Sequence, residues 1–382
     1  MSGSSSNGSH PPDAAAVVAA AIAAGVFPGA VAAIGSSEGS IWTQAFGTLT
    51  FDRAVPVSIE TPFDLASLTK VVATTSVAMN LVASRALRLD ERVADFFNEW
   101  RGADRGDVTV ADLLEHGAGL PARLVDAPPK GRREFEHDIC TMPLEYAPRT
   151  RSIYSDLGFV LLGFLLADRG GGSLADQFDA LWSHLAPHVA ESRGDHPADL
   201  VENGLWRLLT FDVAPPVRRL AAPTMPMPGD ARRGRILRGE VHDNYAAALG
   251  GVAGHAGLFG TAPALGVFAR AVLRGLRGDA TLPPPWTPER LHQFAAKSSV
   301  PGSSRALGWD TMLPTSSCGT RMSSSAIGHA GFTGTSLWID PERDRYFVLL
   351  TNRVLGAGTL EQIREVRRAF HDASADVRGT DD

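Results

Sequence analysis

Lysine is nearly absent from this chain. Only Lys70, Lys130 and Lys297 occur among 36 basic residues in a sequence of 382. Such a preference for arginine is typical of a GC-rich genome, in which arginine codons displace lysine codons. A position that keeps its lysine against this bias is therefore a candidate for a specific role.

The sequence also lacks an excess of basic charge and any larger set of cysteines. Its 42 acidic residues outnumber the basic ones and leave a net charge of −6, and no half of the chain carries a basic excess large enough to indicate a nucleic-acid-binding surface. Cys140 and Cys318 are too few for a disulfide framework in a chain of this length, and they have no metal-ligand spacing. We expect buried free thiols and no nucleic-acid partner.

Long hydrophobic runs are missing as well. The apolar stretch 14–27 is too short to span a membrane, and no lysine or arginine precedes it as a signal peptide would require. The polar residues 1–12, MSGSSSNGSHPP, are predicted to be a flexible leader. These features predict a cytoplasmic protein with no membrane partner.

The pattern of apolar residues places strands at both ends of the chain and helices between them. Two apolar, β-branched segments, 29–36 and 40–50, are joined by a Ser-Glu-Gly turn and predict an antiparallel hairpin. Further strands are expected over 306–312, 324–331, 335–341 and 346–352. From Ser67 to about Ala86 the apolar spacing changes to three and four residues, which indicates a helix. The predicted fold class is α/β (α+β), with an antiparallel sheet flanked by helices from both chain ends and an inserted, mostly helical lobe.

This organisation predicts one catalytic module over residues 13–370. Its α/β lobe is expected to combine 13–66 with 266–370, its helical lobe to span 67–265, and an acidic tail to follow over 371–382. Residues 193–240 are rich in proline, arginine and glycine and have little periodicity. We expect them to form a long surface excursion.

Three short segments carry the residue types that nucleophilic catalysis needs. The first is Ser67-Leu68-Thr69-Lys70, in which a separation of three residues on a helix places Ser67 and Lys70 on one face. A lysine whose pKa is lowered by burial and neighbouring positive charge can accept the serine proton. The preceding residues, FDLA, indicate a loop that enters the first helical turn, where backbone amides can face an oxyanion.

The other two segments allow both a catalytic and a structural interpretation. Tyr154-Ser155-Asp156 begins an apolar helix, so Tyr154 is either a buried proton relay or a core-edge tyrosine with Asp156 as the helix cap. His329-Ala330-Gly331 lies on a late strand, where small residues let a substrate backbone approach closely. Its alternative is a bend with a structural histidine. Taken singly, these residues leave both alternatives open.

Taken in order, these segments resemble the motifs of one superfamily. FDLASLTK, TVADLLEHGAGLP, YSDLGFVLLG and HAGFTGTSLWIDP are similar to segments of the serine β-lactamases and penicillin-binding proteins, over about residues 13–370. More narrowly, the sequence resembles class C β-lactamase-like serine hydrolases of the family VIII carboxylesterase type. The resemblance implies their fold, in which a central helical lobe lies against a terminal α/β lobe.

The resemblance also implies a role for each matching residue. Ser67 would be the acylated nucleophile, Lys70 its proton partner, and Tyr154 the second general base, which later activates the deacylating water. The oxyanion hole would consist of the backbone N–H groups of Ser67 and Phe332. The residues expected to contact the substrate are Asp156, His329, Ala330, Gly331 and His255.

Two positions depart from the β-lactamase pattern. Asp156 stands where the second motif often ends in asparagine, which puts in question a hydrogen bond to a substrate amide. His329 stands where β-lactamases have lysine, and this weakens the expected recognition of a β-lactam carboxylate. The segment 239–262 resembles a subset of these hydrolases, some of which act on cell-wall peptides.

That segment contains His242, Asp243 and His255, which are residue types that bind metals. Their spacing matches no compact zinc motif, so we expect no metal and no other cofactor. His255 lies in a glycine-flanked loop and is expected to line the site instead.

These features together predict a serine hydrolase that acts through a covalent acyl-enzyme on a small ester or amide. A carboxylesterase for short-chain esters, with weak or no β-lactam hydrolysis, is the favoured interpretation. A cell-wall peptide amidase or D-peptidase and a true β-lactamase are alternatives with the same chemistry. A penicillin-recognising sensor or scaffold is the alternative without catalysis, and it would not need Tyr154 for deacylation.

Overall fold

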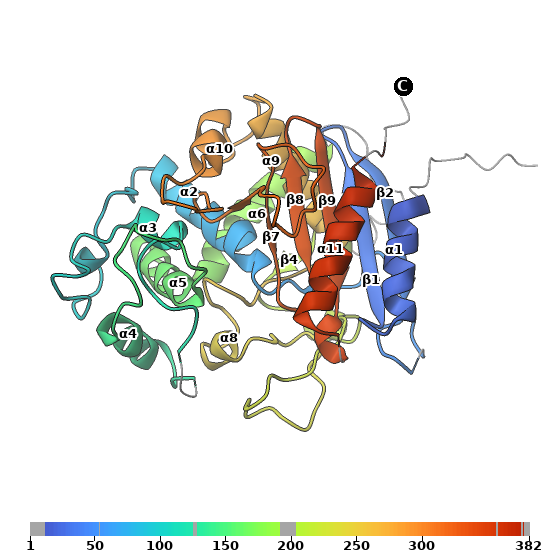
Figure 1. Ribbon diagram of the computed structural model, residues 1–382, viewed down its shortest axis with the longest axis horizontal. Helices are drawn as coiled ribbons and strands as arrows, with labels where there is room; N and C mark the ends of the chain where they lie inside the picture. Colours follow the sequence, from blue (N-terminus) through green and yellow to red (C-terminus); the bar gives the residue numbers. More distant parts are fainter. Residues whose placement is uncertain are drawn as a thin grey trace, which may run out of the picture.

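A computed structural model describes residues 12–52, 54–124, 128–191, 204–356, 358–375 and 377. Its centre is a six-stranded antiparallel sheet with helices on both faces, and a mostly helical lobe lies beside it (Figure 1). This arrangement confirms the fold class that the sequence predicts. The expected leader over 1–12 lies outside the described residues except for its last position.

Both ends of the chain contribute to the central sheet. Its strand order is β2-β1-β9-β8-β7-β6, so the N-terminal hairpin pairs with the last strand. The strands are β1 (Gly29–Gly35), β2 (Ser40–Gly47), β6 (Asp310–Thr311), β7 (Ile327–Ala330), β8 (Ser336–Asp340) and β9 (Arg345–Thr351). Neighbouring strands are antiparallel, and Ala30 lies opposite Thr351 where β1 meets β9. The predicted hairpin and the pairing of the two chain ends are both confirmed.

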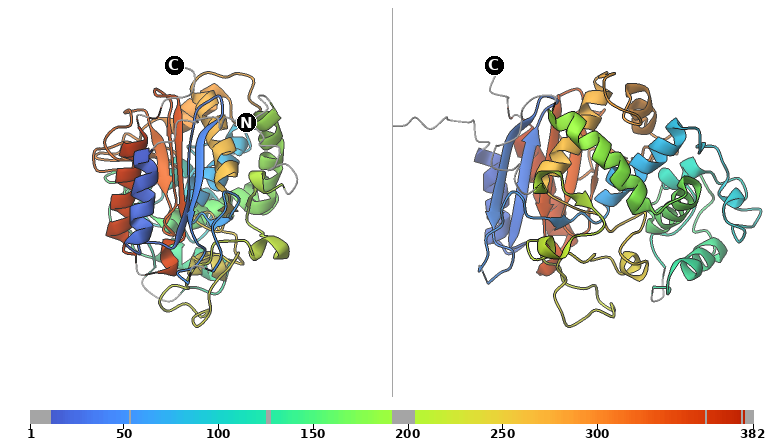
Figure 2. Two further views of the ribbon diagram at one scale, coloured as in Figure 1. Left: turned by 90° about the vertical axis from the view of Figure 1, so that its right-hand side faces the viewer. Right: turned by 180° about the vertical axis from the view of Figure 1, so that it is seen from behind.

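Helices cover both faces of this sheet (Figure 2, left). One face packs against α1 (Pro12–Ala23) and α11 (Leu360–Ser374), and the other against α9 (Ala262–Leu276). Every residue of β1 is therefore buried, and its side chains alternate between two apolar clusters. Because the cluster on the α9 side continues into the helical lobe, the sheet and that lobe share one core.

The remaining elements build the helical lobe and a small second sheet. The helices are α2 (Thr75–Ala83), α3 (Val110–Leu114), α4 (Arg132–Thr141), α5 (Asp156–Gly170), α6 (Leu174–Glu191), α7 (Pro215–Arg218), α8 (Asn244–Ala248) and α10 (Pro288–Ala295). Single 3₁₀ turns occur at Val93–Asp95, Leu205–Arg207 and Arg353–Leu355. The small sheet has the order β3 (Phe63–Asp64), β5 (Phe259–Gly260) and β4 (Leu209–Thr210).

The helix expected from Ser67 to about Ala86 has a different form. It contains a π-helix, η1, at Lys70–Thr74, and continues as α2 only to Ala83. The side chain of Thr75 donates to the Lys70 carbonyl at 2.8 Å, and Thr74 donates to the carbonyl of Gly254 at 2.6 Å. These hydrogen bonds accompany the wider turn, which is a feature found frequently at functional sites.

Three other boundaries also differ from the predicted ones. The strand expected over 306–312 is limited to Asp310–Thr311, because Gly308 has a φ of +88° that interrupts an extended strand. The expected tail from 371 begins inside α11, which continues to Ser374. Of the excursion expected over 193–240, residues 193–203 lie outside the described part, while the rest contributes β4 to the small sheet.

Cys140 and Cys318 are buried free thiols, as predicted. Burial raises the pKa of each thiol to about 12, so neither is a nucleophile at neutral pH. Among the described residues, no single helix has both the length and the apolarity to cross a membrane, although α5 and α6 meet that criterion as a pair bent by 73°.

Candidate active site

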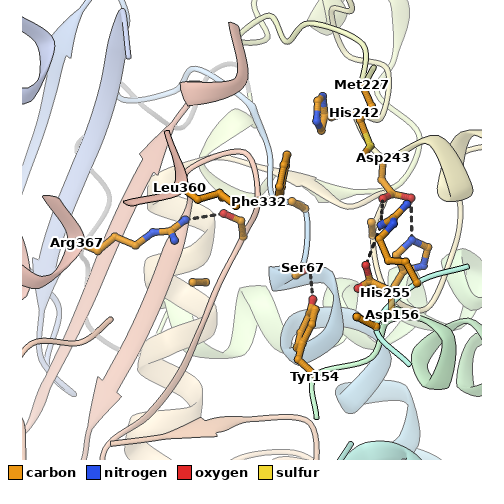
Figure 3. Close-up of a pocket in the computed structure, with 16 residues that line it drawn as sticks. Ser67, Tyr154, Asp156, Met227, His242, Asp243, His255, Phe332, Leu360 and Arg367 are labelled. Atoms are coloured by element: carbon orange, nitrogen blue, oxygen red, sulfur yellow. Dashed lines mark hydrogen bonds and ion pairs between the residues drawn. The ribbon is translucent and has the colours of Figure 1, made fainter. Parts of the chain in front are cut away.

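The three residues predicted to be catalytic lie within hydrogen-bond distance of one another. Lys70 Nζ is 3.0 Å from Ser67 Oγ, and Tyr154 OH is 2.6 Å from each of these two atoms. Figure 3 shows Ser67 and Tyr154 facing each other at the edge of a cavity. The structure therefore brings together the first two motifs, which are far apart in the sequence.

A strained turn presents Ser67 at the start of its helix. Ala66 has a φ of +47°, in the left-handed region that residues with a Cβ seldom adopt. The Asp64 carboxylate accepts a hydrogen bond from the Ala66 amide at 2.8 Å, and Thr69 donates to the Ala66 carbonyl at 2.6 Å. These contacts hold the strained turn in place.

The segment after β7 is fastened to this turn. Thr333 Oγ1 donates to the Asp64 carbonyl at 2.8 Å, and Thr335 Oγ1 donates to the Leu65 carbonyl at 3.0 Å. Gly331 permits the close approach, because a Cβ at that position would lie 2.6 Å from the Leu65 carbonyl oxygen. The two threonines and the glycine of the third motif thus position one backbone segment against another.

This approach places both predicted oxyanion-hole residues on one cavity. Ser67 and Phe332 line the same space, next to Ala66 and Gly331. Within the ranges that the structure describes, neither the Ser67 amide nor the Phe332 amide donates a hydrogen bond to the protein. Two unengaged N–H groups beside a serine hydroxyl are what an oxyanion hole requires, and this role remains a prediction.

Lys70 is buried among polar acceptors. Besides Ser67 and Tyr154, its Nζ donates to Asp156 Oδ1 at 2.7 Å and to the His255 carbonyl at 3.1 Å. Burial lowers the pKa of Lys70, while the neighbouring Asp156 carboxylate opposes that change. Burial and the same carboxylate raise the pKa of Tyr154 well above its usual value, so Tyr154 is a neutral phenol at rest. The arrangement can accept and relay a proton from Ser67.

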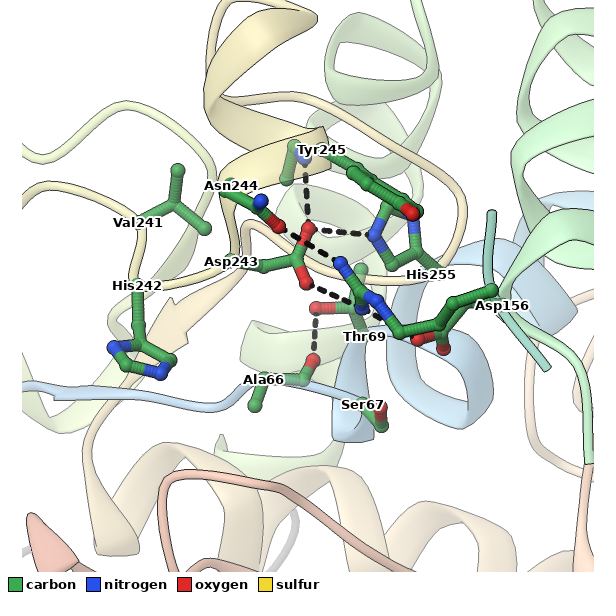
Figure 4. A network of polar contacts seen from close by, with 12 residues as sticks. Ala66, Ser67, Thr69, Asp156, Val241, His242, Asp243, Asn244, Tyr245 and His255 are labelled. Carbon is green, nitrogen blue, oxygen red and sulfur yellow. Dashed lines mark hydrogen bonds and ion pairs between the residues drawn. The ribbon is translucent and has the colours of Figure 1, made fainter. Parts of the chain in front are cut away.

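Asp156 shares its carboxylate with a second cation, Arg123, which the sequence analysis did not identify. Arg123 Nη1 donates to Asp156 Oδ2 and to Asp243 Oδ2, both at 2.9 Å. Asp243 Oδ1 lies 2.8 Å from His255 Nε2, as Figure 4 shows. Basic and acidic side chains therefore alternate from Lys70 to His255. Arg123 is one arginine among many, and no local pattern marks it as a partner of Asp156.

The cavity beside Ser67 has a volume of about 330 Å³. Its apolar lining consists of Ala66, Ala122, Met227, Ala256, Ala330, Phe332 and Leu360. Four of the predicted substrate contacts, Asp156, His255, Ala330 and Gly331, are also part of the lining. His242 adds an aromatic wall, because its ring stacks on Phe332 with the centroids 5.7 Å apart.

His329 is the predicted substrate contact that this cavity lining does not include. Its ring is 3% exposed, and its centroid lies 5.9 Å from that of Tyr154. The Nδ1 atom is 2.9 Å from the Ala330 carbonyl oxygen and therefore carries the proton. Burial, together with the charges of Arg305 and Lys70, lowers the pKa of His329 well below its usual value. His329 is thus uncharged at neutral pH.

The fold and the serine–lysine–tyrosine cluster define the class of this protein. The family profile described as Beta-lactamase matches residues 14–370, which is most of the chain. The chain belongs to this family and is a serine hydrolase of the β-lactamase and penicillin-binding-protein type. The resemblance inferred from the motifs is confirmed.

Two relatives match most of the sequence. A provisionally named D-alanyl-D-alanine carboxypeptidase of Escherichia coli (strain K12) is 30% identical over 345 residues, covering 80% of this chain and 72% of that protein. An N-acetylmuramyl-L-alanine amidase of Bacillus subtilis (strain 168) is 30% identical over 369 residues, covering 87% of this chain and 78% of that protein.

Solved structures share the fold. A class C β-lactamase from Rhodobacter sphaeroides has a TM-score of 0.71 at 19% identity, covering 94% of this chain and 98% of that chain. EstCE1, a hydrolase with promiscuous acyltransferase activity, has a TM-score of 0.68 at 20% identity, with the same coverage of 94% and 98%. At these identities the likeness establishes the fold alone.

Ser67→Ala tests the predicted nucleophile. Because Ser67 Oγ contacts both Lys70 and Tyr154 at the edge of the cavity, its removal should lower kcat by several orders of magnitude and abolish labelling by a fluorophosphonate. Labelling stoichiometry is measured by intact-protein mass spectrometry. Full labelling of the variant would show that another residue is the nucleophile.

The shared Asp156 carboxylate predicts two opposite shifts of the pH profile. Lys70 must be neutral to accept the Ser67 proton, so activity rises with pH through the pKa of Lys70. Asp156→Asn removes the anion that raises this pKa and should move the acidic limb of kcat/KM to lower pH. Arg123→Gln removes a cation that lowers the same pKa and should move the limb to higher pH. The shift in Asp156→Asn should be the larger of the two, because Asp156 bonds Lys70 directly and Arg123 does not.

Profiles of kcat/KM against pH for p-nitrophenyl butyrate measure both shifts. Tyr154, Asp243 and the His255 carbonyl also face Lys70, and both variants leave them in place. Asp168→Asn is the control. Asp168 lies on the same helix as Asp156, but its ion pair with Arg132 is exposed. Equal shifts in one direction, or no shift in either variant, would contradict Lys70 as the base.

Proposed function

We propose that this protein is a carboxylesterase that hydrolyses short-chain esters through an acyl-enzyme on Ser67. The observation that carries the proposal is the contact of Ser67 Oγ with Lys70 and Tyr154 beside a small, mostly apolar cavity. A space of about 330 Å³ suits a short acyl chain, and Met227 and Phe332 give it an apolar wall.

Acylation in this proposal uses the cluster as follows. Ser67 Oγ attacks the ester carbonyl carbon while its proton passes to neutral Lys70. The carbonyl oxygen becomes an oxyanion that accepts hydrogen bonds from the Ser67 and Phe332 amides. Tyr154 then relays the proton to the departing alkoxide, because its hydroxyl is 2.6 Å from both Ser67 Oγ and Lys70 Nζ. The alcohol leaves and the acyl group remains on Ser67.

Deacylation reverses these roles with water as the nucleophile. Tyr154, kept as a neutral phenol at rest, passes its proton to Lys70 and accepts one from the attacking water. A second oxyanion forms and collapses, the bond to Ser67 breaks, and the carboxylic acid is released. The Ser67 proton returns through the same cluster.

The charge pattern around the site favours substrates without a carboxylate. His329 is neutral, so it supplies no charge where β-lactamases of this superfamily have lysine. The cavity lining includes two arginines. Arg123 is already bound by Asp156, Asp243 and Asn244, and Arg367 donates to the Gly331 and Thr335 carbonyls. Neutral esters lose nothing from either feature, whereas β-lactams lose a charge-assisted hydrogen bond.

Hydrolysis of a cell-wall amide is the second candidate, and two observations favour it. Both named relatives carry names of cell-wall enzymes. In addition, the Arg305 guanidinium lies 5.4 Å from the centre of the Tyr154 ring, and its Asp310 partner is 3.8 Å away. A cation in that position would attract the terminal carboxylate of a peptide.

Tyr154→Phe tests the deacylation step. The variant loses only the phenolic hydroxyl, so turnover should fall by about 10²–10⁴-fold while the binding affinity for the substrate changes little. Stopped-flow release of p-nitrophenol separates the acylation burst from steady turnover. A fall of less than about threefold in turnover would remove Tyr154 from the mechanism.

A substrate panel separates the candidate functions. We expect efficient turnover of p-nitrophenyl butyrate and weak turnover of nitrocefin at neutral pH. His329→Lys should raise the nitrocefin-to-ester ratio of kcat/KM by roughly tenfold to a hundredfold, because it restores a charge-assisted hydrogen bond to a carboxylate. Thermal unfolding of the variant shows whether this buried position tolerates lysine. An unchanged ratio in folded protein would exclude His329 from specificity.

The same panel includes a muropeptide that ends in D-alanine. Turnover of this peptide without turnover of the ester would support the second candidate, and Arg305→Gln would then lower activity on the peptide selectively. Stoichiometric acylation by a fluorescent penicillin, without turnover of any substrate, would instead support a sensor or scaffold.

A further inference from the structure

Two buried arginines contact the segment that carries the proposed oxyanion-hole amide. Arg367, on α11, donates from Nη2 to the Gly331 carbonyl at 2.5 Å and to the Thr335 carbonyl at 2.8 Å. Arg353 donates from Nη2 to the Phe332 carbonyl at 2.5 Å. Figure 3 shows the Arg367 guanidinium directed at a carbonyl oxygen of this segment.

In the part of the chain that the structure describes, neither guanidinium is paired with an acid. Among the described residues, no carboxylate lies within 4.0 Å of Arg353 or Arg367. Their exposed fractions are 5% and 7%, and burial lowers the pKa of Arg367 to about 9, so it remains charged at neutral pH. Burial of an unpaired cation costs free energy, which the hydrogen bonds to backbone carbonyls reduce. These carbonyls are therefore the principal partners of both charges.

The Gly331 carbonyl and the Phe332 amide belong to the same peptide group. On its carbonyl side, this group accepts hydrogen bonds from Arg367 and from the Gly334 amide at 3.1 Å. A cation bound to the carbonyl draws electron density from the peptide and makes its N–H a stronger donor. The bond from Arg353 to the next carbonyl fixes the following peptide, so the orientation of the Phe332 N–H is set from both sides.

We propose that Arg367 is a positioning residue that orients and polarises the Gly331–Phe332 peptide, so that the Phe332 N–H stabilises the oxyanion. This inference rests on the proposed function, which assigns that amide to the oxyanion hole. In this role, Arg367 places a permanent positive charge on the carbonyl side of the peptide group. Through that group, the charge acts on the negative charge that develops on the substrate oxygen during acylation. A purely structural alternative is that Arg367 only ties α11 to the sheet.

Two substitutions at Arg367 separate these roles. Arg367→Gln keeps an N–H donor and removes the charge, whereas Arg367→Lys keeps the charge. We expect Arg367→Gln to slow single-turnover acylation by p-nitrophenyl butyrate about tenfold, less than the 10²–10³-fold that follows loss of a direct oxyanion donor. KM should change little, and Arg367→Lys should retain most of the rate. A purely structural tie predicts equal effects of both substitutions.

Phenylboronic acid provides a second readout. Its boron atom accepts Ser67 Oγ and becomes a tetrahedral anion that resembles the acylation intermediate. Arg367→Gln should weaken its inhibition by about the same factor as it slows acylation, because both depend on stabilising negative charge. Arg368→Gln is the matched control, since Arg368 on the same helix donates to the carbonyls of Pro314 and Ser316 instead.

The outcomes distinguish this inference from the proposed function. If a fluorophosphonate does not label Ser67 in the wild type, the proposed function and this inference fail together. If Ser67 is labelled, but Arg367→Gln acylates at the wild-type rate or no more slowly than Arg367→Lys, only this inference is overturned. Should Arg367→Gln not fold, Arg367→His replaces it, because a neutral imidazole keeps an N–H donor without the permanent charge; an acylation rate above about pH 8 equal to that of the wild type would then refute the inference.

Discussion

Lys70 is buried with four hydrogen-bond acceptors around its ammonium group, and this cluster sets the conditions for the rest of the site. An ammonium group has only three N–H bonds, so Ser67, Tyr154, Asp156 and the His255 carbonyl compete for them. Burial favours loss of the proton, and the Asp156 carboxylate favours keeping it. Because these effects oppose each other, the cluster can exchange a proton with Ser67 at a modest free-energy cost.

The pKa of Lys70 also depends on Arg123 and Asp243, which form no hydrogen bond with it. Asp156 would hold Lys70 more strongly if its second oxygen were not engaged by Arg123. Arg123 in turn is bound by Asp243, and Asp243 by His255, whose own carbonyl accepts from Lys70. These contacts therefore form a closed ring that begins and ends at Lys70. A substitution of Asp243 is therefore expected to change proton transfer at Lys70 through Arg123 and Asp156.

The local parts of the site could be predicted from the sequence, because their geometry follows from short separations. Ser67 and Lys70 share a helix face, and the small residues of HAGFTGT allow the close contact of the segment after β7 with the turn before Ser67. Arg123 and Asp243, in contrast, are 120 residues apart and have no shared pattern. The lowered pKa of His329 could not be predicted from the sequence, because it depends on burial and on Arg305, which only folding brings near.

The same reasoning explains which secondary-structure boundaries the sequence misplaced. The apolar spacing after Ser67 correctly indicates a helix, but apolar spacing carries no information about the side-chain bonds of Thr74 and Thr75, which accompany a π-helix at Lys70. In the segment 306–312, strand-forming residues surround Gly308, whose positive φ prevents an extended strand before Asp310. Both differences arise from tertiary contacts and backbone freedom at single positions.

The site explains why one of the few lysines in this chain lies at position 70. Arginine remains protonated in proteins, so it can hold a carboxylate, as Arg123 does, or a carbonyl, as Arg353 and Arg367 do. A residue that must take a proton from Ser67 has to exist first in its neutral form, and burial brings lysine within reach of that state. In a composition that favours arginine almost everywhere, the fixed charges of the site are arginines. The position that must lose its charge keeps a lysine.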